Sequence, residues 1–541
     1  MGWIAHRLVL GGLLFASIAF ASIAPAAALE RVTVESGDLA GRTLAGGQVT
    51  AFLAVPYAAP PVGALRWRPP APPLAWTGVR QADAVGAACM QQPNKPDSIF
   101  YFVTPAVGED CLTLNIWTPA KTSSERRPVM VWLHGGGFRG GTGGAPNYAG
   151  DQLAKLGVVM VTINYRLGLF GFLAHPELDA ESPKHVSGNY GTLDQIAALA
   201  WVKRNIAQFG GDPNRVTLIG QSAGSFSVSY LMASPLAKGL FQRAIGESGA
   251  TMSPVHHGGG MGFGLQPLAD VEQEGVAFAK AEGGSIAALR ARPAAALLQA
   301  AVAAKIGFQP VVDGYVLPDD VYSIFAKGQQ NDVPLLTGSN ANEGSIYTRA
   351  PSAAAYLEQA KKQYGASFAD YIKAYPAESD RQANESAQAA FRDGTFAWHN
   401  WAWARMQATT GKSKVYYYYL DHAPPIPPGT KFAEDPDGAP LGTYHTAEIL
   451  YLFHHFELRH WAWRADDRRL ADRIAGYWVN FARSGDPNVR GQPQWPSFDA
   501  QREQVMHLGA GRVGGVANKP QLLFWEGWFD KARAAKQQAV K

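Results

Sequence analysis

The sequence predicts an α/β fold built on a large, mostly parallel central sheet. Six short runs are rich in Val, Ile, Leu and Tyr, which is typical of strands buried on both faces. Segments with helical patterns lie between these runs, and such alternation favours a parallel sheet flanked by helices. The six runs are PVMVWLH (128–134), VVMVTINYR (158–166), VTLIG (216–220), RAIGESG (243–249), DVPLLTGSN (332–340) and VYYYYLDH (415–422).

One helix and one insertion can be placed between these strands. Residues 191–210 predict a helix, and the apolar residues expected on its buried face are Leu193, Ile196, Leu199, Val202 and Ile206. Residues 251–330 open with the glycine-rich VHHGGGMGFG and continue through alanine-rich helical runs without a clear strand. We expect this stretch to form a helical cap over the sheet, within a single domain that spans residues 29–541.

The first 28 residues have the regions of a secretory signal. Arg7 supplies the cation, residues 8–23 are apolar, and the small residues Ala26 to Ala28 precede the expected cleavage point. An uncleaved N-terminal anchor is the alternative. No later stretch reaches the roughly 18 apolar residues needed to span a bilayer. The sequence therefore predicts a secreted or periplasmic protein without a membrane span.

The net charge and the cysteine content limit the classes of function that the sequence allows. The formal net charge of the 541 residues is +4, and no basic run has interleaved aromatic residues, so we expect no nucleic-acid partner. The only cysteines are Cys89 and Cys111, and an exported protein favours their pairing. Such a bond would contribute about 3 kcal/mol in the chain-entropy model. Two buried free thiols are the alternative.

Ser222 occupies an unusual corner of the chain. The sequence GQSAG surrounds it with small residues, where the apolar run 216–220 gives way to a helical pattern. Glycines at 220 and 224 would relieve crowding at a sharp turn from strand to helix, so the pattern fits the nucleophile elbow G-x-S-x-G. The turn would expose the serine hydroxyl at the start of a helix, where amide groups favour negative charge. A packed serine in a tight turn is the alternative.

Three consecutive glycines follow the strand predicted at residues 128–134. In HGGGF, residues 134–138, the glycines allow main-chain N–H groups to turn towards a substrate oxygen. The same segment matches the dinucleotide pattern G-x-G-x-x-G, but no suitable helix follows it, and the next strand ends in Asn164 rather than an acid. No H-E-x-x-H metal motif occurs either.

A serine nucleophile needs a base and an orienting acid, in the order Ser, acid, His for a fold of this kind. Spacing alone does not choose among the histidines that follow Ser222. These candidates are His256, His257, His399, His422, His445, His454, His455, His460 and His507.

Ordered motifs along nearly the whole mature chain resemble those of the type-B carboxylesterases, a family that also includes cholinesterases and bacterial p-nitrobenzyl esterases. The motifs are VPYAAPPVGALRWRPP (55–70), EDCLTLNIWTP (109–119), HGGGF (134–138), NYRLG (164–168), GNYGTLDQ (188–195), FGGDPNRVTLIGQSAG (209–224), PVVDG (310–314), NEGS (342–345), GTYHTAEI (442–449) and WVNFARSGDPN (478–488).

The resemblance implies an α/β-hydrolase fold and a serine esterase that uses neither a metal nor an organic cofactor. It implies that Ser222 is the nucleophile, Glu343 the acid and His445 the base. The implied oxyanion hole consists of the amides of Gly136, Gly137 and Ala223. The implied disulfide joins Cys89 to Cys111, and the implied structural ion pairs are Arg66 with Glu109 and Arg166 with Asp194.

Two departures from cholinesterases bear on the substrate. The residue before the nucleophile is Gln221 rather than glutamate, and residues 91–108 contain Phe100, Tyr101 and Phe102 but no tryptophan. A site for a quaternary ammonium group is therefore poorly supported. We expect a small-molecule ester as substrate. Amide or carbamate hydrolysis and lipase action with the same triad are alternatives, and a non-catalytic binding protein is a more remote one.

Overall fold

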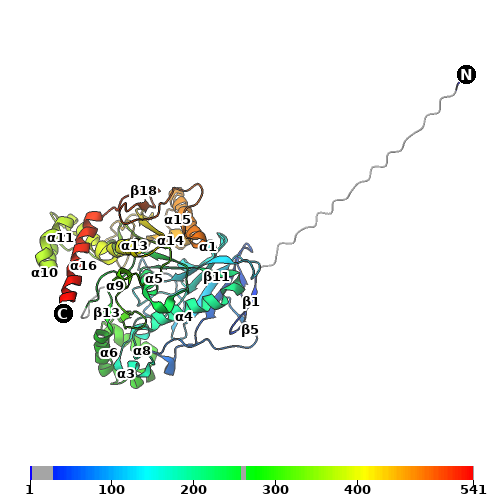
Figure 1. Cartoon of the computed structure of the whole chain (residues 1–541), viewed down its shortest axis with the longest axis horizontal. Coiled ribbons are helices and arrows are strands. Elements are labelled where there is room, and N and C mark those ends of the chain that lie inside the picture. Colours follow the sequence, from blue (N-terminus) through cyan, green and yellow to red (C-terminus); the bar gives the residue numbers. More distant parts are fainter. Residues whose placement is uncertain (3–28, 257–263, 540–541) are drawn as a thin grey trace.

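The six apolar runs lie in one sheet in the computed structural model, which describes residues 1–2, 29–256 and 264–539 (Figure 1). Neighbouring strands are parallel from β10 to β17, and antiparallel strands form both edges. The predicted α/β class is confirmed. Within the described residues the sheet has eleven strands, in the order β3 (Arg42–Thr43), β4 (Thr50–Pro56), β8 (Thr113–Thr118), β10 (Val159–Ile163), β9 (Arg127–Leu133), β11 (Gly211–Gln221), β12 (Arg243–Glu247), β15 (Leu335–Asn340), β16 (Val415–Leu420), β17 (Val505–His507) and β18 (Arg512–Gly514).

Helices cover both faces of this sheet, which explains why its central strands are mostly apolar. Val129 and Val131 of β9 pack in one core with the first group of helices, and Met130 and Trp132 pack in a second core with the other group. In Figure 1, α4 lies below the sheet and α14 and α15 lie above it. The first group is α4 (Tyr190–Asn205), α5 (Ala223–Ala233) and α13 (Trp398–Thr410), and the second is α1 (Asp151–Lys155), α14 (Ala447–Phe453) and α15 (Ala465–Ser484).

Helix α4 differs from its predicted pattern. Leu193 and Ile196 are only half-buried, whereas the polar residues Thr192, Asp194 and Gln195 are buried. The polar side chains are accommodated because Asp194 pairs with an arginine and Gln195 donates to a serine of α5. A single apolar face is therefore the wrong description of this helix.

The stretch from 251 to 330 contains four helices and one pair of two-residue strands among its described residues. Helices α6 and α8 lie together at the bottom of Figure 1, beside α3. The expected cap, like the boundaries of the single domain, remains a prediction. Of the expected signal peptide, residues 3–28 lie outside the described residues, as do residues 257–263 of the cap. The elements of this stretch are β13 (Gln266–Pro267), α6 (Leu268–Glu282), α7 (Ile286–Ala291), α8 (Ala294–Ala303), β14 (Val311–Val312) and α9 (Val321–Ala326).

Smaller elements complete the described chain. The short strands form a three-stranded sheet, β1–β2–β5, and a parallel pair, β6–β7. These strands are β1 (Arg31–Val34), β2 (Gly37–Ala40), β5 (Val79–Gln81), β6 (Ala88–Cys89) and β7 (Val107–Gly108). The other helices are α2 (Gly168–Phe172), α3 (Pro176–Glu181), α10 (Ala353–Tyr364), α11 (Phe368–Ala374), α12 (Asp380–Arg392) and α16 (Lys519–Ala539).

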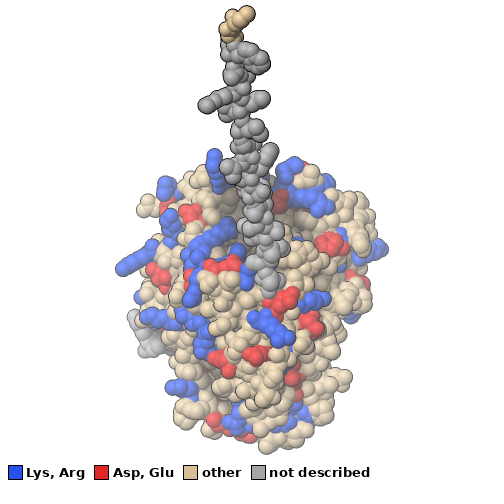
Figure 2. All heavy atoms as spheres, turned by 90° about the vertical axis from the view of Figure 1, so that its right-hand side faces the viewer, with Lys and Arg blue, Asp and Glu red and all other residues tan. Residues whose placement is uncertain are grey.

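The surface carries charges of both signs. Lys and Arg side chains are interspersed with Asp and Glu on the face shown in Figure 2. None of the helices within the described residues is both long enough and apolar enough to cross a membrane.

Candidate active site

Ser222 lies at the sharp turn between β11 and α5. Its φ and ψ are 55° and −125°, a strained combination for a residue with a side chain. The turn is possible because its flanking residues are glycines: a Cβ at Gly220 would lie 2.4 Å from the carbonyl carbon of Gly224, and a Cβ at Gly224 would lie 2.0 Å from Leu133 O. The serine N–H donates to Glu247 O at 2.9 Å. The strand-to-helix corner predicted from GQSAG is present.

The glycine loop that follows β9 lies against this corner. A Cβ on Gly135 would lie 3.0 Å from the Cβ of Ser222. Gly136 and Gly137 have φ values of +111° and +61°, which glycine adopts without strain. The amides of Gly136, Gly137 and Ala223 have no hydrogen bond to any other described residue. They are thus available to bind an oxygen, as the prediction for this loop requires.

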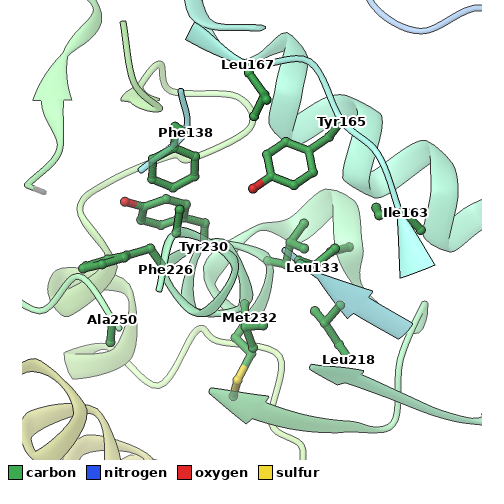
Figure 3. Close-up of a cluster of buried hydrophobic side chains, with 14 of the residues drawn as sticks. Leu133, Phe138, Ile163, Tyr165, Leu167, Leu218, Phe226, Tyr230, Met232 and Ala250 are labelled. Carbon is green, nitrogen blue, oxygen red and sulfur yellow. The ribbon is translucent and has the colours of Figure 1, made fainter. Parts of the chain in front are cut away.

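Aromatic packing holds the loop in place. Phe138 stacks on Tyr230 of α5, with ring centroids 6.1 Å apart (Figure 3). His134 stacks on Tyr165 at 4.4 Å, and the Tyr165 hydroxyl donates to His134 O at 2.7 Å. Burial lowers the pKa of His134 to about 4, so this ring is neutral at pH 7. These contacts give His134 a structural role beside the loop.

The loop closed by the disulfide also contacts the glycine-rich segment. Cys89 and Cys111 form a disulfide. Two residues after Cys89, the Gln91 amide receives a hydrogen bond from Gly141 N and donates one to Gly141 O, both at 2.7 Å. This two-way amide contact joins the loop closed by the disulfide to the end of the glycine-rich segment.

Glu343 and His445 contact each other, although they are 102 residues apart in the sequence. His445 Nδ1 lies 2.8 Å from Glu343 Oε2, and both side chains are fully buried. Asn340 N donates to the other carboxylate oxygen at 2.6 Å, and Gln221 donates to His445 O at 2.7 Å. Because Gln221 precedes Ser222, this last hydrogen bond holds the backbone of His445 close to the turn that carries Ser222. His445 Nε2 has no hydrogen-bond partner among the described residues.

Two aromatic rings enclose His445. Phe396 stacks on the imidazole with centroids 4.2 Å apart, and Tyr347 contacts it edge-on at 5.4 Å. Phe396 belongs to η7 (Asp393–Ala397), a π-helical turn between α12 and α13. Such turns often occur at functional sites. The sequence did not predict that Phe396 stacks on His445, because a π-helical turn has no recognisable periodic pattern of residues.

Four of the other candidate histidines, His399, His422, His455 and His507, have partners other than Glu343. His399 accepts from Met252 N, and burial lowers its pKa to about 3. His422 pairs with Asp467, an aspartate whose other oxygen caps the start of α15. His455 contacts Glu457 and Ala149 O, and His507 contacts Gly515 O. Among the candidates in the described part of the chain, His445 is the one that contacts Glu343, and its role as the base stays a prediction. His257 lies outside the described residues.

Two further carboxyl groups are buried in residues that lie close to Ser222 or His445 in the chain or in the fold. Trp478 Nε1 donates to Glu247 at 2.5 Å, and Asn340 donates to Glu448 at 2.5 Å. Burial raises the pKa of Glu247 to about 8. Burial and the proximity of Glu247 raise the pKa of Glu448 well above its usual range. Glu448 is three residues from His445, and the backbone oxygen of Glu247 accepts the Ser222 N–H, but no sequence pattern marked either side chain as buried.

The two predicted ion pairs are present. Arg66 contacts Glu109 through two hydrogen bonds of 2.7 Å, and Arg166 contacts the fully buried Asp194 in the same bidentate way at 2.7 and 2.8 Å. Buried, paired charges of this kind fix the scaffold.

Comparison with known proteins agrees with this geometry. A sequence model described as "Carboxylesterase family" matches residues 28–525. The chain belongs to the carboxylesterase family. This carboxylesterase is 36% identical over 489 residues to a fumonisin B1 esterase of Sphingopyxis macrogoltabida, an alignment that covers 86% of the chain and 84% of that protein. It is 34% identical over 498 residues to the para-nitrobenzyl esterase of Bacillus subtilis (strain 168), with 88% and 94% covered.

A solved structure of a PNB esterase superposes with a TM-score of 0.76 at 30% identity, covering 91% of this carboxylesterase and 99% of that chain. The expected α/β-hydrolase fold is confirmed. The enzyme is a carboxylic ester hydrolase, and its family implies small-molecule ester substrates.

Proposed function

We propose that this enzyme is an exported serine carboxylesterase that works through an acyl-enzyme formed on Ser222. The observation that carries the proposal is the pairing of His445 Nδ1 with Glu343, which leaves Nε2 without a partner among the described residues. An imidazole oriented in this way accepts a proton from a serine hydroxyl.

The proposed reaction has two halves. In the first, Ser222 Oγ attacks the ester carbonyl carbon while its proton passes to His445 Nε2. The carbonyl oxygen becomes negative and binds the amides of Gly136, Gly137 and Ala223. His445 then returns the proton to the leaving alcohol as the acyl-enzyme forms. In the second half, water attacks the acyl-enzyme by the same proton transfers, and the acid is released.

Gln221 supports a substrate other than a choline ester. Its side-chain nitrogen already donates to His445 O at 2.7 Å, and the side chain is neutral. The residue next to the nucleophile therefore contributes a structural hydrogen bond and no negative charge for a quaternary ammonium group.

Export is supported by the disulfide and by the character of the N-terminal sequence. Disulfides persist in oxidising compartments, and the bond between Cys89 and Cys111 is formed here. We propose that the mature chain begins at Leu29 and is periplasmic or extracellular.

One experiment tests both parts of this proposal. The intact mass of the exported protein is measured before and after reaction with a fluorophosphonate, alongside turnover of 4-nitrophenyl acetate and butyrate. The expected result is a chain that begins at Leu29 and gains one adduct, with loss of both the adduct and turnover in Ser222→Ala. The exposed Ser123→Ala is the matched control and retains both. Turnover by a folded Ser222→Ala protein would exclude the mechanism, and a mass that includes residues 1–28 would exclude cleavage.

A further inference from the structure

Arg139 extends from the same tight turn that carries the proposed oxyanion amides. Its N–H and that of Gly140 both donate to Gly136 O at 3.1 Å, which fixes the backbone of the turn. Only one residue separates Arg139 from Gly137, so their Cα atoms are at most about 7 Å apart. The residue is exposed, and so is Gly136. A cation on this turn is therefore within side-chain reach of a substrate bound at the amides.

The guanidinium of Arg139 rests on Gly307, in the segment that follows α8. A Cβ on Gly307 would lie 1.9 Å from Arg139 Nη2 and 2.4 Å from Cζ. The guanidinium thus occupies the space that a side chain at 307 would take. This contact joins the glycine loop to the segment between α8 and β14 and gives the cation a defined position.

Within the described part of the chain, no acidic side chain is bound to this cation. No carboxylate within residues 29–256 and 264–539 forms an ion pair or a hydrogen bond with Arg139. In contrast, Arg66 and Arg166 are each bound by a carboxylate in bidentate fashion. Arginine remains charged throughout the working pH range, and its planar donors match a carboxylate. An unpaired arginine beside a reaction site is suited to bind an anionic group of the substrate.

We infer that Arg139 binds a free carboxylate of the substrate, and that the enzyme prefers esters that carry such a group near the scissile bond, such as monoesters of dicarboxylic acids. This inference rests on the proposed function, because it places the substrate carbonyl at the amides of Gly136 and Gly137. A carboxylate held by a guanidinium forms charge-assisted hydrogen bonds, and a neutral ester of the same shape cannot form them.

The test compares anionic and neutral esters of the same skeleton. The probes are the mono-4-nitrophenyl esters of succinic, glutaric and adipic acids, and the same compounds with the second carboxyl capped as a methyl ester. Release of 4-nitrophenol is measured at pH 7, with the Ser222→Ala protein as the background rate. We expect kcat/KM to be higher for at least one anionic ester than for its capped form, and this preference to fall as salt is added.

Two substitutions remove the contact in different ways. Arg139→Gln is expected to lower kcat/KM for the preferred anionic ester at least tenfold, mainly through KM, and to change the capped ester less than twofold. Gly307→Ala leaves Arg139 in the chain but displaces its guanidinium, so it should reproduce this loss. Arg80→Gln removes one charge in the small sheet, where Arg80 contacts the ring of Trp76, and should change neither rate.

The outcomes separate this inference from the proposed function. Equal loss for anionic and capped esters in Arg139→Gln would overturn the inference, since it would assign the arginine to general stabilisation of the reaction. Unchanged rates for every ester would overturn it too. Equal turnover by wild type and Ser222→Ala would instead overturn the proposed function itself.

Discussion

At the scale of single residues, the imidazole of His445 is held by contacts from three directions. Glu343 binds Nδ1, Gln221 donates to the backbone carbonyl, and Phe396 stacks on the ring. Each contact comes from a different segment of the chain. The position of Nε2 thus depends on the assembled fold and not on the local sequence around the histidine.

Replacing the acid tests this arrangement. Glu343→Gln preserves the size of the side chain and an oxygen for Asn340 N, but it removes the charge that stabilises the imidazolium. We expect kcat for 4-nitrophenyl butyrate to fall by roughly 10³ to 10⁴, with little change in KM. Steady-state kinetics measure this change, and thermal unfolding checks that the variant is folded. A kcat close to that of the wild type would mean that a different acid orients the histidine.

The sequence alone located Ser222 by its small neighbours and strand-to-helix context, whereas the choice of Glu343 and His445 needed the family resemblance. Other residues of the site were not predictable in either way. Asn340 contacts Glu448, 108 positions away in the chain, and Phe396 stacks on His445, 49 positions away. Such contacts exist only after folding, so no local pattern encodes them.

At the scale of elements, apolar runs predicted six of the parallel strands because helices cover both faces of the sheet, but not the three-residue β17, which pairs in parallel with β16. The antiparallel strands β4 and β8 were not predicted. Strand β8 contains the buried Asn115, whose side chain accepts from Ala54 N and donates to Thr162 Oγ1 and Gly143 O. A polar residue that bonds to neighbouring segments interrupts the apolar run by which a buried strand is identified.

The close contact between α5 and β9 leads to a prediction about the turn that carries Ser222. Ala in place of Gly224 would press its Cβ against Leu133 O, a backbone atom that cannot rotate away. We expect Gly224→Ala to lower the free energy of unfolding by about 1 to 3 kcal/mol, and to reduce turnover because Ser222 shifts with the helix.

The matched control is Gly476→Ala in α15, where the added Cβ has open space. This substitution should leave stability unchanged or raise it by up to about 1 kcal/mol, since alanine is the better helix former. The midpoint of urea unfolding measures both variants. Equal midpoints for Gly224→Ala and Gly476→Ala would show that α5 can move away from β9 at little cost in stability.

At the scale of the whole molecule, the buried carboxyl of Glu247 links folding to pH. Burial raises its pKa to about 8 in the folded chain, compared with about 4.3 when exposed. Below pH 4 both states hold the proton, and its contribution to stability is fully present. Between these pKa values the unfolded chain loses the proton while the folded chain keeps it, so stability falls as pH rises, by at most about 1.4 kcal/mol per pH unit.

Glu247→Gln removes this titration, so its free energy of unfolding should decline less than that of the wild type between pH 5 and pH 8. Urea unfolding at several pH values measures the two slopes. Glu385→Gln is the control, because Glu385 is an exposed partner of Arg381 and should leave the slope unchanged. Parallel slopes for wild type and Glu247→Gln would show that this carboxyl is ionised in the folded protein.

The C-terminal helix α16 also has a bearing on how the protein is handled. The ring of Trp525 fills the space beside Gly394, where a Cβ would lie 2.4 Å from it, and Gly394 shares its π-helical turn with Phe396, the residue that stacks on His445. Helix α16 therefore supports the turn that packs against His445, the proposed base. A truncation that removes α16, or a fusion partner that displaces it, would therefore also disturb the packing around His445, far from the end of the chain in sequence.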